Sequence, residues 1–193
     1  MSEDVRILVL AAGRSSRMRG RDKLLEEVDG EPLLTRQVRV ARATGRPVTV
    51  ALPARPHPRY AVLRDVETLE VADSADGMGR TLAAGFAHLA GSDAILILLA
   101  DLPEVTTDDL RAVLEAERRP GEIVRGASLC GRPGHPILVP QTAFADFAAL
   151  EGDDGGRAAI SRHPVSLVRL PGEHAVLDLD TPEDWADWQA SRS

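Results

Sequence analysis

The residues best suited to chemistry in this sequence are the cations of one short loop and a few aspartates far from it in the chain. Between Gly13 and Lys23 the loop carries five cations and a single acid, namely Arg14, Arg17, Arg19, Arg21, Lys23 and Asp22. Asp101 ends the most apolar run of the chain, and Asp180 follows a later one. Cationic side chains neutralise phosphates, and Mg²⁺ prefers one or two carboxylates together with phosphate oxygens. These residue types predict a site for a metal-bound phosphate compound.

Lys23 is the only lysine in the chain. A compact ammonium on a flexible stem is therefore expected to matter there, because an arginine presents a broad planar group instead. The loop with Gly13 could wrap a triphosphate with its backbone N–H groups. It matches neither the Walker pattern nor the dinucleotide fingerprint. A solvated surface loop stays open as an alternative, as do simple turn or helix-supporting roles for Asp101 and Asp180.

The elements that must position these residues alternate along the chain. Apolar and β-branched runs predict strands at residues 5–10, 48–52, 69–72, 94–100, 123–124, 137–139, 165–170 and 176–179. Helical spacing predicts helices opened by Pro32, over 81–90, after a Thr107 cap, from Gln141, and after a Thr181 cap with Pro182 first. This alternation predicts an α/β fold with an open, mostly parallel sheet.

Ligands bind such sheets at the carboxyl ends of the strands. We therefore expect residues 11–23, Asp101 and residues 178–180 to share one edge. If residues 176–179 form a strand, Asp178 and Asp180 point to opposite faces and at most one completes a metal site. Asp180, at the strand exit, is the favoured ligand.

Composition limits the class of protein. The 193 residues, 44% apolar and 27% charged, predict one globular domain over 1–193. No run approaches the roughly 20 apolar residues of a membrane helix, and no signal peptide is recognisable, so we expect a cytoplasmic protein without a membrane partner. The net charge of −7 argues against nucleic-acid binding. Cys130, the lone cysteine, is expected to pack within a strand.

Six motifs, in order along the chain, resemble those of MobA-like nucleotidyltransferases, and in particular of molybdenum cofactor cytidylyltransferases. The motifs are Leu10-Ala11-Ala12-Gly13-Arg14-Ser15-Ser16-Arg17-Met18 with Lys23-Leu24-Leu25, Gly77-Met78-Gly79, Ala100-Asp101-Leu102-Pro103, Gly134-His135-Pro136, Gly152-Asp153 through Arg157, and Asp178 through Asp184. The resemblance implies a single-domain, Rossmann-like three-layer sandwich of the nucleotide-diphospho-sugar transferase type, with helices on both faces.

The resemblance also implies roles for matching residues. Nucleotide contacts fall on Leu10, Ala11, Ala12, Gly13, Arg14, Ser15, Gly77, Met78 and Gly79. Arg17 and Lys23 hold phosphates and act in catalysis with Asp101, and Asp101 with Asp180 binds the cofactor Mg²⁺. Gly134 and His135 contact the acceptor, although His135 could equally hydrogen-bond a neighbouring backbone group.

The implied reaction joins CMP from CTP to the terminal phosphate of molybdopterin and releases pyrophosphate. CTP is favoured because related guanylyltransferases usually have Gly where this chain has Ala12. Three alternatives stay open: GTP as donor, a sugar or polyol phosphate as acceptor, and a non-catalytic module that hands cofactor to a molybdenum hydroxylase. Transient contact with such a hydroxylase is compatible with catalysis. Residues 151–157 could form an active-site flap or an ordinary polar loop.

Overall fold

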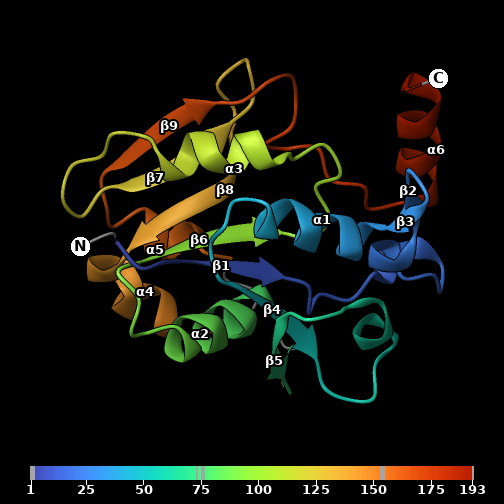
Figure 1. Cartoon of the computed structure of the whole chain (residues 1–193), viewed down its shortest axis with the longest axis horizontal. Helices are drawn as coiled ribbons and strands as arrows, with labels where there is room; N and C mark the ends of the chain where they lie inside the picture. The colour runs from blue at the N-terminus through green and yellow to red at the C-terminus, as the bar shows by residue number, and fades with distance from the viewer. Residues whose placement is uncertain (1–2, 73, 75–76, 153–154, 193) are drawn as a thin grey trace.

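A seven-stranded sheet forms the centre of the computed structural model, which describes residues 3–72, 74, 77–152 and 155–192. The strands lie in the order β5-β4-β1-β6-β8-β7-β9 (Figure 1). Their bounds are Val5–Leu10 (β1), Val48–Pro53 (β4), Glu67–Val71 (β5), Ala94–Leu99 (β6), Ile123–Ala127 (β7), Pro133–Pro140 (β8) and Val165–Arg169 (β9). Only β8 runs antiparallel to its neighbours in this sheet. The prediction of a mostly parallel sheet is confirmed.

Helices cover both faces of the sheet. One face carries α1 (Leu33–Arg42), α3 (Thr107–Leu114) and α6 (Pro182–Ser191), and the other α2 (Met78–His88), α4 (Phe144–Ala148) and α5 (Arg157–Ile160). Each layer has its own core, with Leu34, Leu110 and Trp185 in the first and Phe86, Phe147 and Ile160 in the second. The predicted three-layer α/β architecture is therefore confirmed (Figure 1).

The remaining elements are short. They are the hairpin of β2 (Glu27–Val28) and β3 (Glu31–Pro32), and the 3₁₀ helices Ser16–Met18, Lys23–Leu25, Pro58–Val62 and Gln141–Ala143.

The central strands fix where the functional loops start. Leu10, the last residue of β1, lies beside Leu99 of β6 and Ala51 of β4 in parallel register. The next amide, of Ala11, donates to the Ala51 carbonyl at 2.9 Å. Because all three strands end at one edge, the loop after β1 and Asp101 after β6 emerge side by side.

The predicted strand at residues 176–179 is wrong. This segment is a loop, in which the amides of Val176 and Leu177 both donate to the Glu173 carbonyl at 2.9 Å. The Ala175 carbonyl accepts the amide of His135 at 2.8 Å, so the loop crosses the start of β8. Leu179 is only 1% exposed, and Val176 and Leu177 pack partly buried against the same core. An apolar run was thus mistaken for a strand.

Three local expectations also need correction. The helix expected over 81–90 begins earlier, at Met78, so Met78 and Gly79 lie in the first turn of α2. The cap of α3 is Thr106, one residue before the predicted Thr107, because Thr106 and Asp109 form a reciprocal capping box. Cys130 is exposed in the turn after β7 and does not pack within a strand.

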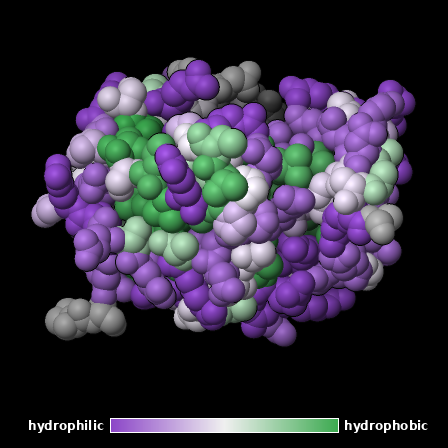
Figure 2. Space-filling view, turned by 90° about the horizontal axis from the view of Figure 1, so that it is seen from above, coloured by the Kyte–Doolittle hydropathy of each residue, from purple (hydrophilic) through white to green (hydrophobic). Residues whose placement is uncertain are grey.

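The edge strand β9 carries apolar side chains to the surface. It lies at the top of the view in Figure 1, and Figure 2 looks onto that side, where hydrophobic areas lie among hydrophilic residues. Val165 and Leu167 of β9 are 40% and 45% exposed. Within the described ranges, no helix is long and apolar enough to span a bilayer.

Candidate active site

Loops at the carboxyl edge of the sheet enclose a first cavity of about 500 Å³. Of the residues predicted to contact nucleotide or metal, the first cavity is lined by Leu10, Ala11, Ala12, Gly13, Arg14, Arg17, Lys23, Gly77, Met78, Asp101 and Asp180. It is also lined by Asp178, which was expected at this edge as the less favoured metal ligand, and by Arg59, Thr81 and Leu99, which sequence reasoning did not assign to the site. The cavity therefore joins segments from both ends of the chain.

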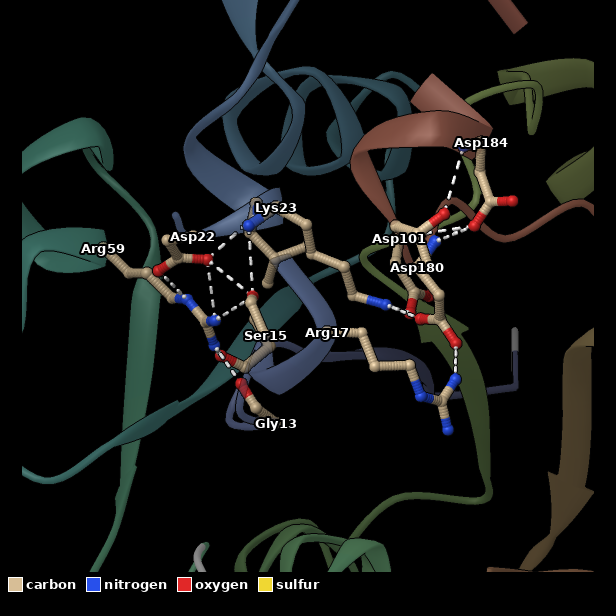
Figure 3. Close-up of polar contacts among 12 residues, drawn as sticks. Gly13, Ser15, Arg17, Asp22, Lys23, Arg59, Asp101, Asp180 and Asp184 are labelled. Carbon is tan, nitrogen blue, oxygen red and sulfur yellow. Dashed lines mark hydrogen bonds and ion pairs between the residues drawn. The ribbon is translucent and has the colours of Figure 1, made fainter. Parts of the chain in front are cut away.

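Lys23 is the centre of the charged side chains in this cavity (Figure 3). Its Nζ donates to Oδ2 of Asp101 and to Oδ1 of Asp180, both at 2.6 Å. The second carboxylate oxygen of Asp180 accepts from the guanidinium of Arg17. Burial alone would lower the pKa of Lys23, but the charges and hydrogen bonds of Asp101 and Asp180 outweigh it and raise that pKa. Lys23 is therefore a stable cation at neutral pH.

The aspartates have acceptor capacity to spare. Oδ1 of Asp101 is buried without a hydrogen-bond partner. Asp178 lines the same cavity, and its pKa is raised by desolvation and then by the negative charges of Asp180 and Asp101. Because residues 176–179 are not a strand, Asp178 and Asp180 are not forced to opposite faces, and both reach the cavity. A cation beside these carboxylates would relieve their mutual repulsion.

The donor set suits a metal that brings other ligands with it. Across the described parts of the chain, no group of three or more His, Cys, Asp or Glu residues forms a ready-made metal cage. Mg²⁺ is usually held by one or two carboxylates, with phosphate oxygens and water completing its octahedron. Asp101 and Asp180, both in the wall of the first cavity, fit that requirement when a triphosphate is present.

Arg59 is the main residue that sequence reasoning missed. It is 2% exposed, and all five of its N–H donors are used (Figure 3). Nε and Nη2 donate to the two carboxylate oxygens of Asp22 at 2.7 and 2.8 Å. Nη1 donates to the carbonyls of Ala11 and Gly13 at 2.6 and 2.8 Å, and Nη2 also reaches the Ser15 hydroxyl at 3.3 Å. No local pattern marks this arginine, which lies 36 positions beyond Lys23.

Arg59 sets the orientation of two peptide units in the loop. In a trans peptide the N–H points away from the C=O of the same unit. Since the carbonyls of Ala11 and Gly13 face Arg59, the amides of Ala12 and Arg14 face the opposite way. Neither amide has a partner among the described residues. Two free backbone donors beside a cavity are suited to binding an anion.

Ser15 and Gly13 show different uses of the same loop. The Ser15 hydroxyl donates to Asp22 and accepts from the Lys23 amide, both at 3.1 Å, so its side chain is occupied within the loop. A Cβ added at Gly13 would meet nothing within 4 Å. Gly13 therefore leaves open space at the cavity wall, which is available to a ligand.

The start of helix α2 forms another wall of the first cavity. A Cβ on Gly79 would lie 2.7 Å from the carbonyl oxygens of Glu151 and Gly152, so α2 can approach that segment only with glycine here. Gly79 thus has a packing role, while Gly77 and Met78 line the cavity. The predicted motif residue Asp153 lies outside the described residues.

A capping box positions Asp180. Thr181 caps α6, and Oδ2 of Asp184 accepts from the amides of Thr181 and Asp180 at 2.8 and 3.2 Å. The predicted cap and the Pro182 start are confirmed. Asp180 is therefore held by its backbone at a rigid helix start, and its carboxylate is directed to Lys23.

A second cavity of about 630 Å³ adjoins the first, and the two share Leu10 and Met78 in their walls. His135 lines the second cavity. Burial, followed by the charge of Arg125, lowers the pKa of His135 to about 4, so its ring is neutral at neutral pH. Gly134 allows close packing, since a Cβ there would lie 2.0 Å from the Ala175 carbonyl oxygen.

Known proteins with similar sequence and structure point to one family. Residues 7–167 match the MobA-like NTP transferase domain. The purine catabolism protein PucB of Bacillus subtilis is 27% identical over 191 residues, which cover 91% of each chain. A probable molybdenum cofactor guanylyltransferase of Synechococcus elongatus is 34% identical over 193 residues, covering 95% of this chain and 97% of the relative.

Among solved structures, Rv0371c of Mycobacterium tuberculosis in complex with manganese superposes with a TM-score of 0.81. It is 26% identical, with 97% of this chain and 99% of that chain covered.

Proposed function

The chain belongs to the MobA-like NTP transferase domain family and is a nucleotidyltransferase, and from this premise we propose that it transfers CMP from CTP to the terminal phosphate of molybdopterin. The observation that carries the proposal is the contact of Lys23 with Asp101 and Asp180, at 2.6 Å each, in a cavity bordered by free backbone amides. Cations, amide donors and carboxylates together are what a metal-bound triphosphate requires.

The reaction needs no general base, because the acceptor phosphate is already an anionic nucleophile at neutral pH. Its oxygen attacks the α-phosphorus, the bond from that phosphorus to the bridging oxygen breaks, and the electron pair leaves with pyrophosphate. The obstacle is repulsion between two phosphates, which cations must cancel while holding the groups in line. We assign this task to Lys23 and Arg17, with the amides of Ala12 and Arg14 orienting the triphosphate.

Asp101 and Asp180 would hold the divalent ion, for which we propose Mg²⁺, and Asp178 lines the same cavity beside them. When bound, the ion neutralises phosphate charge and stabilises the departing pyrophosphate. Lys23 then contacts phosphate oxygens in addition to the carboxylates, since an ammonium has three donors and only two are used in the free protein.

Ala12 supports the choice of CTP. It lines the first cavity and is only 2% exposed, so its methyl group takes up wall space that a glycine would leave open. The smaller cytosine ring suits the narrower wall. GTP is the competing donor, because the Synechococcus elongatus relative is named a probable molybdenum cofactor guanylyltransferase.

Two measurements test this function. Thermal unfolding with Mg²⁺ and increasing CTP or GTP identifies the base, because only the preferred nucleotide stabilises strongly at low concentration. Pyrophosphate release is then measured with each triphosphate and with molybdopterin or a sugar phosphate as acceptor. We expect release with CTP and molybdopterin, and we expect Ala12→Gly to shift the preference toward GTP.

Other outcomes would replace the proposal. Faster release with GTP would reassign the donor, and release only with a sugar phosphate would reassign the acceptor. No pyrophosphate from any triphosphate would favour a non-catalytic module that binds molybdenum cofactor and passes it to a hydroxylase.

A further inference from the structure

The second cavity is lined by apolar side chains and by three arginines. Its floor includes Ile97 and Ile137, while Arg125, Arg132 and Arg157 add guanidinium groups. No acidic residue lines this cavity within the ranges that the structure describes. Such a wall attracts a negatively charged ligand with an apolar body.

Arg125 is the least compensated of these cations. It rises from β7 and is half-buried, and its Nε and Nη2 both donate to the Gly134 carbonyl at 3.3 Å. That carbonyl is its only hydrogen-bond acceptor among the described residues, and no carboxylate pairs with it. Burial, followed by the charge of Arg157, lowers the pKa of Arg125. A partly desolvated cation next to a like charge costs free energy, which a bound anion would recover.

Arg157 and Arg132 differ in whether a carboxylate neutralises their charge. Arg157 is the first residue of α5, which lies on the face of the sheet covered by α2 and α4. Its side chain is exposed and has no ion-pair partner in the described structure. Arg132 instead pairs with Glu173 at 2.8 Å. The uncompensated charge therefore belongs to Arg125 and Arg157.

The anion that these arginines bind is distinct from the triphosphate. Arg14, Arg17 and Lys23 line the first cavity, whereas Arg125 and Arg157 line only the second. The acceptor phosphate must come within about 3–3.5 Å of the α-phosphorus to react, so it belongs at the first cavity. His135, which lines the second cavity, is neutral and adds no charge to it.

We propose that Arg125 and Arg157 form an anion subsite for a second negatively charged group of the acceptor, at the end remote from the phosphate that receives the nucleotide. This inference rests on the proposed function. The acceptor class is then an elongated molecule with an anionic group at each end and an apolar or planar middle. Sugar phosphates with a single anionic group cannot use the subsite.

The test measures the binding of inorganic sulfate while a non-hydrolysable CTP analogue and Mg²⁺ saturate the first cavity. Sulfate is titrated at constant ionic strength against chloride, and thermal unfolding is followed. We expect saturable stabilisation of the wild type and roughly tenfold weaker sulfate binding in Arg157→Gln, because a charge-assisted hydrogen bond is lost. Arg157 is exposed, so this variant is expected to fold normally.

Three matched variants complete the experiment. Arg125→Gln is expected to weaken sulfate binding as Arg157→Gln does, while Arg125→Lys keeps the charge and retains part of the binding. Arg132→Gln, on the same cavity but already neutralised by Glu173, is expected to bind like the wild type. Equal sulfate responses in all variants would overturn the subsite and indicate only general salt stabilisation.

A loss of sulfate binding on adding the CTP analogue would also overturn the proposed subsite, because the sulfate would then share the triphosphate site. Binding of the analogue itself is recorded in the same titrations with every variant. If the analogue fails to bind, the donor assignment fails and not the subsite, so the two failures can be told apart.

Discussion

At the scale of single residues, the chemistry depends on side-chain shape as much as on charge. Nζ of Lys23 lies 2.6 Å from oxygens of two different aspartates, and the Lys23 side chain is only 14% exposed. A compact ammonium can donate to both carboxylates and still turn its third proton toward a ligand. A planar guanidinium would need a wider gap. This explains why one lysine stands in a chain whose other cations are arginines.

Lys23→Ala is expected to lower turnover by roughly 10² or more while the fold persists, because a cation that stabilises phosphate charge is lost. Pyrophosphate release at saturating CTP, Mg²⁺ and acceptor measures this, with circular dichroism as the control for folding. Lys23→Arg is expected to restore little of the activity, since the guanidinium does not fit between Asp101 and Asp180. Near-normal release by Lys23→Ala would remove Lys23 from the catalytic residues.

Gly13→Ala is expected to separate ligand binding from stability. The added methyl meets no protein atom within 4 Å, so the free energy of unfolding is expected to change by at most about 0.5 kcal/mol. In the complex the methyl occupies the ligand's space, and binding of the CTP analogue is expected to weaken by about 1–3 kcal/mol. Isothermal titration calorimetry measures this.

Gly91→Ala is the matched control, because Gly91 also has open space around its Cβ position but lies in the turn before β6, away from the cavity. Equal nucleotide affinity of both variants would show that the ligand does not approach Gly13.

At the scale of elements, two helices begin with the same reciprocal capping box but at different distances from the site. Thr181 and Asp184 cap α6 directly beside Asp180, whereas Thr106 and Asp109 cap α3. The backbone amide of Asp180 donates to the Asp184 carboxylate at 3.2 Å, so the α6 cap also fixes a residue of the cavity. The cap therefore contributes to site geometry as well as to helix stability.

Thr181→Ala and Thr106→Ala are each expected to destabilise the protein by about 1 kcal/mol, the usual cost of losing a cap. Only Thr181→Ala is expected to weaken metal binding, by roughly tenfold, because a group that orients a metal ligand is disturbed. The Mg²⁺ dependence of pyrophosphate release and urea unfolding provide the two readouts. Equal Mg²⁺ dependence of both variants would mean that the α6 cap serves stability alone.

At the scale of the whole molecule, the buried imidazole of His135 makes the free energy of unfolding depend on pH. The pKa of His135 is about 4, below its usual value near 6.5, so the folded protein binds this proton less well than the unfolded chain. The contribution of neutral His135 to stability is therefore fully present above pH 6.5. It is lost as the pH falls from 6.5 toward the folded pKa of about 4.

Between pH 7.5 and 5, the His135 ring is expected to account for about 2 kcal/mol of lost stability. Urea unfolding of the wild type and of His135→Leu at both pH values measures this difference, and NMR titration of the imidazole reports its pKa directly. An ordinary His135 titration near 6.5 would contradict the prediction.

The sequence by itself determined the elements whose signals are local. The apolar runs 5–10, 48–52 and 94–100 were confirmed as β1, β4 and β6, because strands buried on both faces of a parallel sheet are rich in apolar and β-branched residues. The Thr181 cap was also predictable, since its partner lies three residues away. Alternation of strands and helices then placed the loop after β1 and Asp101 at one edge.

Tertiary structure alone decided what depends on distant partners. The apolar residues Val176, Leu177 and Leu179 pack against the core from a loop, and apolarity does not distinguish such packing from strand pairing. Arg59 orients the loop after β1 through contacts across 37 to 48 positions, which no spacing rule anticipates. The unpaired charges of Arg125 and Arg157 likewise appear only when β7 and α5 are folded together. A charge becomes informative once its surroundings are known, and only the fold supplies those surroundings.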